Sequence, residues 1–352
     1  MKRLFAMLLL VPSLASADTE LGVYGDVDGH AHTQGSRDST TDSFSAASVE
    51  LFAVARQGRW SFLSEINFEA DDTNEFSMDV ERLEVAYVHA DWLRFVFGRF
   101  PVAMGWYSDA INHGAIFQLP ATRAVMVSFE DEGGLAPSHS VGVHTDGRLA
   151  VADDHIRYDV ELGNGRAADL DTVQSNHDEN RAKSLNVRLR YEPGGALDGL
   201  LVGANVYFDS IDADDVSPDD KLPASPALHE WIYGAHAAYL EHGFHFVTET
   251  MMVRHVELGS GIVRTTYGTF VEAGHTFDKL TPFARYERVR YPAAGDPYYQ
   301  RDAADSFDAV SAGIRHATND NIALKLQATA SKAPVPGSSV DYALTGQIAF
   351  GF

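Results

Sequence analysis

The residues of this chain that could carry chemistry are charged side chains at alternate positions of short apolar segments. Glu249 stands in the run FHFVTETMMVRH and Lys325 in the run IALKLQATAS. Residues two apart share one face of a β-strand, so in the second run Lys325 shares a face with Gln327, opposite Leu324 and Leu326. Inward-facing charges of this kind can hydrate a water-filled interior or pair across strands. Where opposite signs face each other, they set a transverse electric field.

The alternation nominates a set of side chains of both signs for the inner wall. The primary candidates are Glu65, Arg82, Glu84, Arg94, Asp159, Glu161, Arg188, Arg190, Glu249, Glu272, Arg285 and Lys325. Further candidates are Asp26, Asp28, Glu50, Glu69 and Arg157.

The first 17 residues, MKRLFAMLLLVPSLASA, have the pattern of a secretory signal peptide. Lys2 and Arg3 precede an apolar run at 4–11, and a small-x-small cleavage site ends at Ala17. The run is too short to span a membrane as a helix. We therefore expect cleavage near Ala17 and a single mature domain over residues 18–352.

Composition excludes several classes of protein. Removing Lys2 and Arg3 leaves 25 basic against 50 acidic residues, a net charge of −25, so binding to nucleic acid is not expected. The absence of cysteine excludes disulfide scaffolds and thiolate metal sites. The acidic connections at 70–79 and 210–230 could enrich cations at a channel mouth, or bind divalent ions that bridge to lipopolysaccharide phosphates.

Sixteen segments with period-two alternation follow the signal peptide, and their connections alternate between long and short. The predicted strands are 21–32, 45–55, 60–69, 80–89, 93–100, 139–145, 156–163, 185–191, 200–209, 231–240, 244–255, 265–277, 281–291, 306–316, 322–331 and 340–352. An even strand number with alternating short turns and long loops is typical of outer-membrane barrels. The sequence predicts an all-β fold, a transmembrane antiparallel barrel of about 16 strands in the outer membrane of a Gram-negative cell.

The distribution of polar residues distinguishes this barrel from a soluble one. Charges fall mid-strand on one face of most strands, whereas a soluble barrel needs an apolar interior. Trp60 and Trp92 start strands beside short turns and predict one aromatic girdle, and Phe100 and Tyr291 predict the other. The chain ends on Phe352, which is similar to the signal that outer-membrane proteins present to the barrel-insertion machinery.

The longest connection, residues 101–138, holds large apolar groups that a solvated loop does not need. We expect this third external loop to fold into the lumen, with Trp106, Tyr107, Phe117 and Phe129 packed on the wall. Its acidic residues and His113 are expected to face water. The candidate constriction residues are Trp106, Asp109, His113, Arg123, Glu130, Asp131 and Glu132.

The segment from Arg94 to Tyr191 resembles the phosphate-selective porin O/P family. The motifs that carry the resemblance are FVFGRFPVAMGW (95–106), LAPSHSVGVHTDGRL (135–149), IRYDVELGNGRA (156–167) and SLNVRLRYEP (184–193). The resemblance implies a sixteen-stranded, trimeric pore with an inward-folded third loop. The family's lysines at the constriction are absent here: residues 101–138 hold one basic residue, Arg123, so phosphate selectivity is not carried over.

These features predict a porin for passive diffusion of small hydrophilic solutes or ions, with a weak preference for cations. The alternatives are a solute-specific channel, a surface barrel that binds metal or solute through its His- and Asp-rich loops, and a barrel that sheathes a partner protein. No Gly-x-Ser-x-Gly motif occurs, and no catalytic residue, cofactor or metal site is predicted. The expected partners are outer-membrane lipid, lipopolysaccharide, the insertion machinery and two further copies of the chain.

Overall fold

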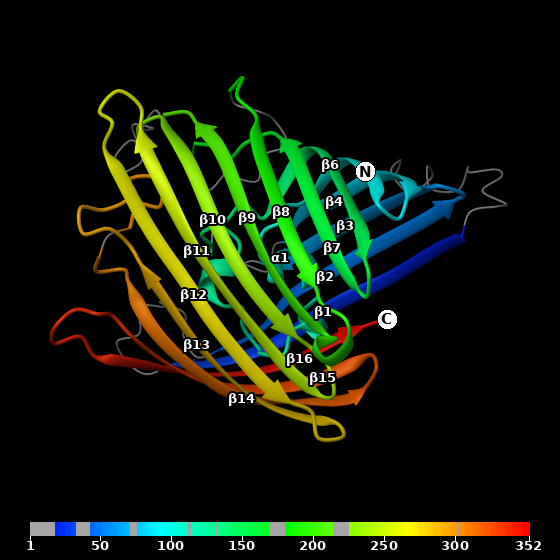
Figure 1. Ribbon diagram of the computed structural model, residues 1–352. Coiled ribbons are helices and arrows are strands. Elements are labelled where there is room, and N and C mark those ends of the chain that lie inside the picture. Colours follow the sequence, from blue (N-terminus) through cyan, green and yellow to red (C-terminus); the bar gives the residue numbers. More distant parts are fainter. Residues whose placement is uncertain are drawn as a thin grey trace, which may run out of the picture.

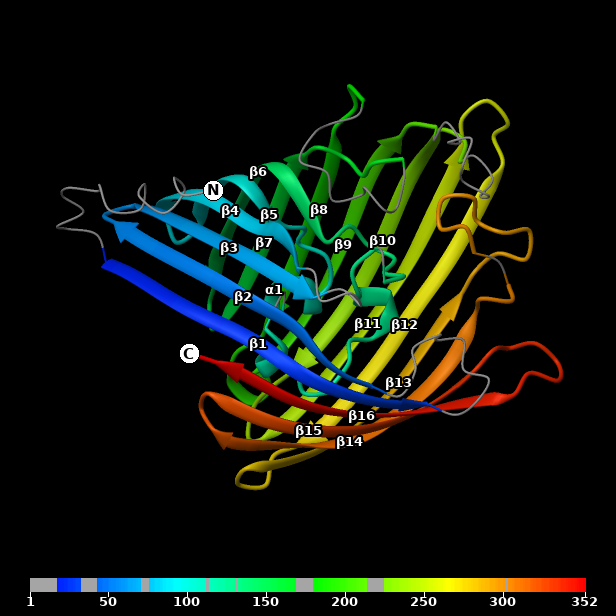
Figure 2. The same cartoon turned by 180° about the vertical axis from the view of Figure 1, so that it is seen from behind.

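The described part of the chain folds into one closed ring of β-strands. A computed structural model describes residues 18–32, 43–70, 76–111, 114–130, 132–168, 180–213, 225–301 and 303–352. Within these ranges sixteen strands pair antiparallel with their sequence neighbours, and β1 closes the ring on β16 (Figures 1 and 2). The predicted fold class, a sixteen-stranded antiparallel barrel, is confirmed.

Each predicted strand has a counterpart in the structure. The strands are β1 (Asp18–His32), β2 (Ser43–Gln57), β3 (Trp60–Ala70), β4 (Phe76–Ala90), β5 (Leu93–Pro101), β6 (His139–Val151), β7 (Asp154–Gly163), β8 (Ser184–Glu192), β9 (Leu200–Ile211), β10 (Leu228–Tyr239), β11 (Phe244–Glu257), β12 (Val263–His275), β13 (Leu280–Arg290), β14 (Phe307–Asn319), β15 (Ile322–Lys332) and β16 (Val340–Gly351). The short helices are α1 (Tyr107–Ala110), η1 (Ala115–Phe117), η2 (Val125–Val127) and η4 (Gly195–Leu197). Within the described ranges, no helix is long and apolar enough to cross a membrane.

The hairpin of β6 and β7 is longer than the sequence predicts. The expected strand ends at Thr145, whereas the ladder continues until Val151 pairs with Asp154. Ala152 closes the turn with a positive φ of 54°. Gly147 lets β6 run close to the start of β5, because a Cβ at this position would stand 2.0 Å from the carbonyl oxygen of Trp92. The extension adds Arg148 to the inner wall.

The two faces of β15 and β16 differ in polarity as the alternation predicts. In β15, Lys325 and Gln327 are buried inside the barrel, while Leu324 and Leu326 are exposed on the outside. In β16, Gln347 is buried and Ile348 is exposed. Polar side chains therefore line much of the inner face and apolar side chains the outer face, the reverse of a soluble barrel. The strands β10 to β13 also turn apolar groups inward, including Ile232, Val247 and Phe270.

One of the two predicted aromatic girdles is wrong. Trp60 and Trp92 are half-exposed on the outside, beside the short turns. Phe100 and Tyr291, which the sequence assigns to the second girdle, are instead buried: Phe100 packs with Val96, and Tyr291 belongs to the main apolar cluster inside the barrel. Phe100 shares the strand parity of Val96, so its ring points inward.

Candidate functional site

The segment that links β5 to β6 is hydrogen-bonded to side chains from strands all around the ring. In Figures 1 and 2 its helix α1 lies among the strands, enclosed by them. Two glutamates hold the beginning of this segment. Glu161 accepts hydrogen bonds from the Ala103 N–H at 2.9 and 3.2 Å, and Glu249 accepts them from Trp106 at 3.0 Å and Tyr107 at 2.7 Å.

The rest of the segment is held by acceptors on the opposite side of the ring. Three side chains accept hydrogen bonds from its backbone: Glu50 on β2 from Gly114, Gln327 on β15 from Ala121, and Glu287 on β13 from Val125. The donor–acceptor distances are 3.1, 3.0 and 2.8 Å, respectively. Wall side chains thus satisfy backbone N–H groups that burial would otherwise leave unpaired.

Wall cations bind the carbonyl oxygens of the same segment. Arg188 donates to Gly105 O at 2.8 Å, Lys325 to Pro120 O at 2.9 Å, and Arg285 to Thr122 O at 2.6 Å and Arg123 O at 3.1 Å. Arg315 donates to Ile116 O at 3.0 Å. Glu161, Glu249, Arg188, Arg285 and Lys325 are all buried. These five predicted wall residues therefore anchor the segment, and their contribution to a conducting path remains a prediction.

Apolar packing supplies the second attachment of the segment. Trp106, Tyr107 and Ile111 are buried in one cluster with residues of β9 to β13, including Ile232 and Phe270. Phe117 differs from the expectation: it is 55% exposed and meets Tyr24 edge-on, with ring centroids 5.1 Å apart. The interior is therefore filled more fully on the β9–β13 side.

The charged constriction candidates lie in different environments. The prediction that Glu130 faces water is wrong: it is buried, and it accepts hydrogen bonds from the Ser138 N–H at 2.9 Å and hydroxyl at 2.7 Å. Glu132 is exposed. Arg123 lies over the ring of Phe129, 4.5 Å from its centroid. His113 and Asp131 lie outside the described residues, as does the side chain of Asp109.

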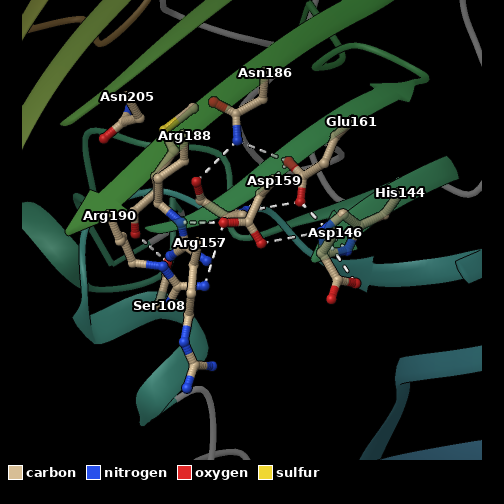
Figure 3. A network of polar contacts seen from close by, with 12 residues as sticks. Ser108, His144, Asp146, Arg157, Asp159, Glu161, Asn186, Arg188, Arg190 and Asn205 are labelled. Atoms are coloured by element: carbon tan, nitrogen blue, oxygen red, sulfur yellow. Dashed lines mark hydrogen bonds and ion pairs between the residues drawn. The ribbon is translucent and has the colours of Figure 1, made fainter. Parts of the chain in front are cut away.

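A polar network covers the wall formed by β6, β7 and β8 (Figure 3). Asp159 lies at its centre and contacts His144 at 3.2 Å, Arg188 at 2.9 Å and Arg190 at 3.2 Å. Asn186 links Glu161 to the Ala103 carbonyl, at 2.8 and 2.9 Å. Ion pairing of this kind offsets part of the cost of burying each charge.

A row of three arginines crosses the same wall. Arg148 on β6 is in register with Arg157 on β7, which is in register with Arg190 on β8. Glu192 pairs with Arg148 at 3.2 Å and with Arg157 at 2.6 Å. The side chains of Arg148 and Arg157 remain 45% and 42% exposed. Arg148 is not among the wall residues predicted from the sequence, because β6 is longer than its apolar pattern indicates.

The remaining wall candidates pair with each other or stay partly exposed. Glu65 forms an ion pair with Arg82 across β3 and β4. Glu272 contacts His245 at 2.8 Å, and Arg94 contacts Asp146 at 2.8 Å. The β1–β3 sector also holds Asp26, Asp28 and Glu50, all buried. Glu84 is partly buried. Acidic and arginine-rich sectors therefore occupy different parts of the ring.

A buried ionic cluster at the long-connection end was missed by sequence reasoning. Arg166 donates to Glu230 at 2.8 Å, and His255 lies 2.8 Å from both Glu230 and Asp296. Tyr299 donates to the carbonyl of Leu135 at 2.6 Å. Burial alone would lower the pKa of Arg166, but the Glu230 carboxylate raises it well above its usual value. The cluster joins the connections that follow β5, β7 and β13.

Gly105 is required where the segment turns under Glu249. Its φ is +62°, and a Cβ there would stand 1.9 Å from Glu249 Oε2. Glu249 cannot move freely, because two backbone N–H groups hold it. Gly105→Ala is expected to lower the free energy of unfolding by about 1–3 kcal/mol more than a matched control, owing to this clash.

Gly195→Ala is the matched control for that measurement. Gly195 has a similar φ of +66°, and a Cβ added there would have nothing within 4 Å. Its substitution adds the backbone strain without the clash. Denaturant titration in detergent gives both values, and equal losses would show that the Gly105–Glu249 contact is unimportant.

Comparisons with known proteins define the fold. No protein-family model matches the chain, and no curated protein sequence matches it. Among solved structures, OmpT of Vibrio cholerae, folded in vitro, is similar with a TM-score of 0.64 at 11% identity, covering 97% of this chain and 99% of that one. The trimer form of the same protein has a TM-score of 0.61 at 10% identity, covering 95% and 100%.

An anion-selective porin from Comamonas acidovorans is also similar. Its TM-score is 0.61 at 10% identity, covering 96% of this chain and 100% of that one. At these identities the likeness shows a shared fold. The chain therefore has the sixteen-stranded barrel architecture of outer-membrane porins.

Proposed function

We propose that this chain is an outer-membrane porin, a water-filled channel for passive diffusion of small hydrophilic solutes or ions. The observation that carries the proposal is the inverted polarity of the barrel: charged side chains face inward, and Leu324, Leu326 and Ile348 are among the apolar side chains exposed outside. Such an outer face is suited to lipid. The segment bound inside the ring serves as the constriction of the channel.

Targeting and assembly follow from the same proposal. Residues 1–17 direct secretion and are cleaved, and Phe352 presents the chain to the insertion machinery. A homotrimer is the proposed assembly, supported by the shared fold with OmpT, for which a trimer form is known. Membership of the phosphate-selective porin O/P family rests on the motifs at 95–193 alone.

A weak preference for cations is the proposed selectivity. The mature chain carries a net charge of −25, and the β1–β3 sector of the wall is acidic. The exposed Arg148 and Arg157 oppose this preference, because they raise the local concentration of anions. The fold alone does not set the sign, since a porin described as anion-selective shares it.

Reversal potentials in a salt gradient across a planar bilayer test the channel and its selectivity together. The wild-type chain is expected to conduct ohmically with a cation-positive reversal potential. The double variant Arg148→Gln/Arg157→Gln should shift that potential further toward cations, because it removes two positive charges from the lumen. Arg254→Gln, on the outer face of β11, is the matched control and should leave it unchanged.

Each other outcome has a distinct meaning. An anion-selective wild type would contradict the proposed preference but retain the channel. Block by one solute at low concentration would favour a solute-specific channel. No conductance at all would sink the porin proposal.

A further inference from the structure

The outer face of the barrel carries a group of charges at the external ends of β13, β14 and β15. We call Arg288, Arg290 and Lys332, with Asp308 between them, the outer basic cluster. Arg285, Glu287 and Val289 are buried inside, so alternation turns Arg288 and Arg290 outward. Asp308 is in register with Arg288 on one side and with Lys332 on the other.

The cluster has more positive charge than its carboxylate balances. Arg288 Nε donates to Asp308 Oδ1 at 2.6 Å, and Arg290 pairs with the other carboxylate oxygen. Tyr286 also donates to Asp308, at 2.6 Å. Three cations and one carboxylate leave a net charge of +2. The Arg288 side chain is 49% exposed and Lys332 is exposed, so this charge is presented outward.

The position of the cluster along the barrel matches the level of lipid headgroups. β13 ends at Arg290, β14 begins at Phe307 and β15 ends at Lys332, all at the end with long connections. Charges on the outer face are costly at the bilayer centre and tolerated at the interface. Arginine and lysine at this level suit phosphate oxygens, which guanidinium groups bind in a bidentate manner.

An apolar groove begins directly beside the cluster on the same outer face. The cross-strand pair next to Asp308 and Lys332 on the outer face is Val310 with Ala330, followed by Ala312 with Ala328. These small side chains form a groove of about 560 Å³. It meets a second groove of about 640 Å³ at Ala31 and Leu344.

The second groove extends the first toward the middle of the barrel wall. Leu324, Leu326 and Ile348 line it, and Gly346 forms part of its floor. A Cβ on Gly346 would meet nothing within 4 Å, so the missing side chain leaves open space. The apolar lining of this groove suits a flexible hydrocarbon chain.

We propose that the outer basic cluster and the adjoining groove bind a phosphorylated lipid of the external leaflet. The phosphate lies against Arg288, Arg290 and Lys332, and an acyl chain fills the groove down to Gly346. The inference rests on the outer-membrane location proposed above. A lipid is favoured over a second copy of the chain because the groove pairs a net positive rim with an apolar floor, which matches the charged head and apolar tail of a phosphorylated amphiphile.

Native mass spectrometry of the full chain in detergent tests the proposal. The probes are diphosphorylated lipid A and the same lipid after dephosphorylation. Wild-type protein should bind the phosphorylated form about tenfold more tightly, because charge-assisted hydrogen bonds require the phosphates. Arg288→Gln/Arg290→Gln should abolish that difference. Arg56→Gln, which removes an arginine from an exposed ion pair with Glu20 at the other end of the barrel, should retain it.

A second pair of variants tests the groove. Gly346→Leu fills the open space and should weaken binding of both lipid forms, whereas Ala273→Leu, on the exposed outer face of β12, should not. Inorganic phosphate at equal concentration should not displace the lipid. Three outcomes would each overturn the proposal. The first is equal binding of both lipid forms by the wild type, and the second is full displacement of the lipid by phosphate. The third is a Gly346→Leu protein whose subunit number changes while its lipid binding does not.

Conductance separates this inference from the proposed function. The substitutions at Arg288, Arg290, Gly346 and Ala273 lie on the outer face, so single-channel conductance should equal that of the wild type. If the chain conducts but does not bind lipid A, only the lipid-site proposal is contradicted. If it binds lipid A but does not conduct, only the channel proposal is contradicted.

Discussion

Deletion of residues 106–118 raises single-channel conductance, by an expected factor of about two or more, because it widens the narrowest cross-section of the path. Trp106, Tyr107 and Ile111 occupy the barrel interior and are lost in this variant. The deletion removes the backbone N–H groups that donate hydrogen bonds to Glu249 and Glu50. Water replaces these donors once the interior opens, so the barrel is expected to fold.

The control deletion removes residues 335–338 from the connection between β15 and β16. These residues are mostly exposed. Their removal shortens this connection by four residues without touching the segment, and conductance should stay at the wild-type value. If the 106–118 deletion likewise leaves conductance unchanged in planar bilayers, the segment does not restrict the conducting path.

Glu230→Gln is expected to destabilise the folded barrel by about 3–5 kcal/mol, the cost of leaving a buried cation without its counter-ion. Glu230 is fully buried and is shared by Arg166 and His255, each 2.8 Å away. Neither Arg166 nor His255 can reach water instead, since both are buried. Denaturant unfolding in detergent, followed by circular dichroism, measures the loss.

Two further variants define the cause of that loss. Glu20→Gln removes a carboxylate from the exposed pair with Arg56 and should change stability little, because exposed ion pairs are weak. The double variant Glu230→Gln/Arg166→Gln should recover part of the loss, since the guanidinium that lost its nearest carboxylate is gone. A Glu230→Gln protein as stable as Glu20→Gln would show that the cluster is not a structural link.

The same cluster ties the segment to the external connections. Arg166 also donates to the carbonyl of Leu135 at 3.4 Å, and Tyr299 donates to it at 2.6 Å. Loss of Glu230 should therefore increase current noise as well as lower stability. The increase in current noise and the loss of stability would have the same cause, the release of the segment from its neighbours.

Local sequence pattern accounts for the barrel. Alternation in β15 and β16 assigns Lys325 and Gln347 to the inside and Leu324 and Ile348 to the outside, and the structure agrees. This works because the face that a side chain occupies depends only on its parity within a strand. The same reasoning fails for Phe100 and Tyr291, since aromatic identity near a strand end does not reveal which face the ring takes.

Residue pairing inside the barrel required the tertiary structure. Nothing local to Glu249 indicates that it accepts hydrogen bonds from Trp106 and Tyr107, which are 143 and 142 residues away in the chain. Such pairs arise from the register of each strand and from closure of β1 on β16, which bring distant segments together.

The sequence by itself determined the sixteen strands, their inward and outward faces and the unusual composition of residues 101–138. Only the tertiary structure decided what the inward charges do: Glu161, Arg188 and Lys325 bind the backbone of that segment, while Arg148 and Arg157 remain exposed. The physical reason is that side-chain direction is a property of the local backbone, whereas a hydrogen-bond partner depends on where the whole ring places a second chain segment.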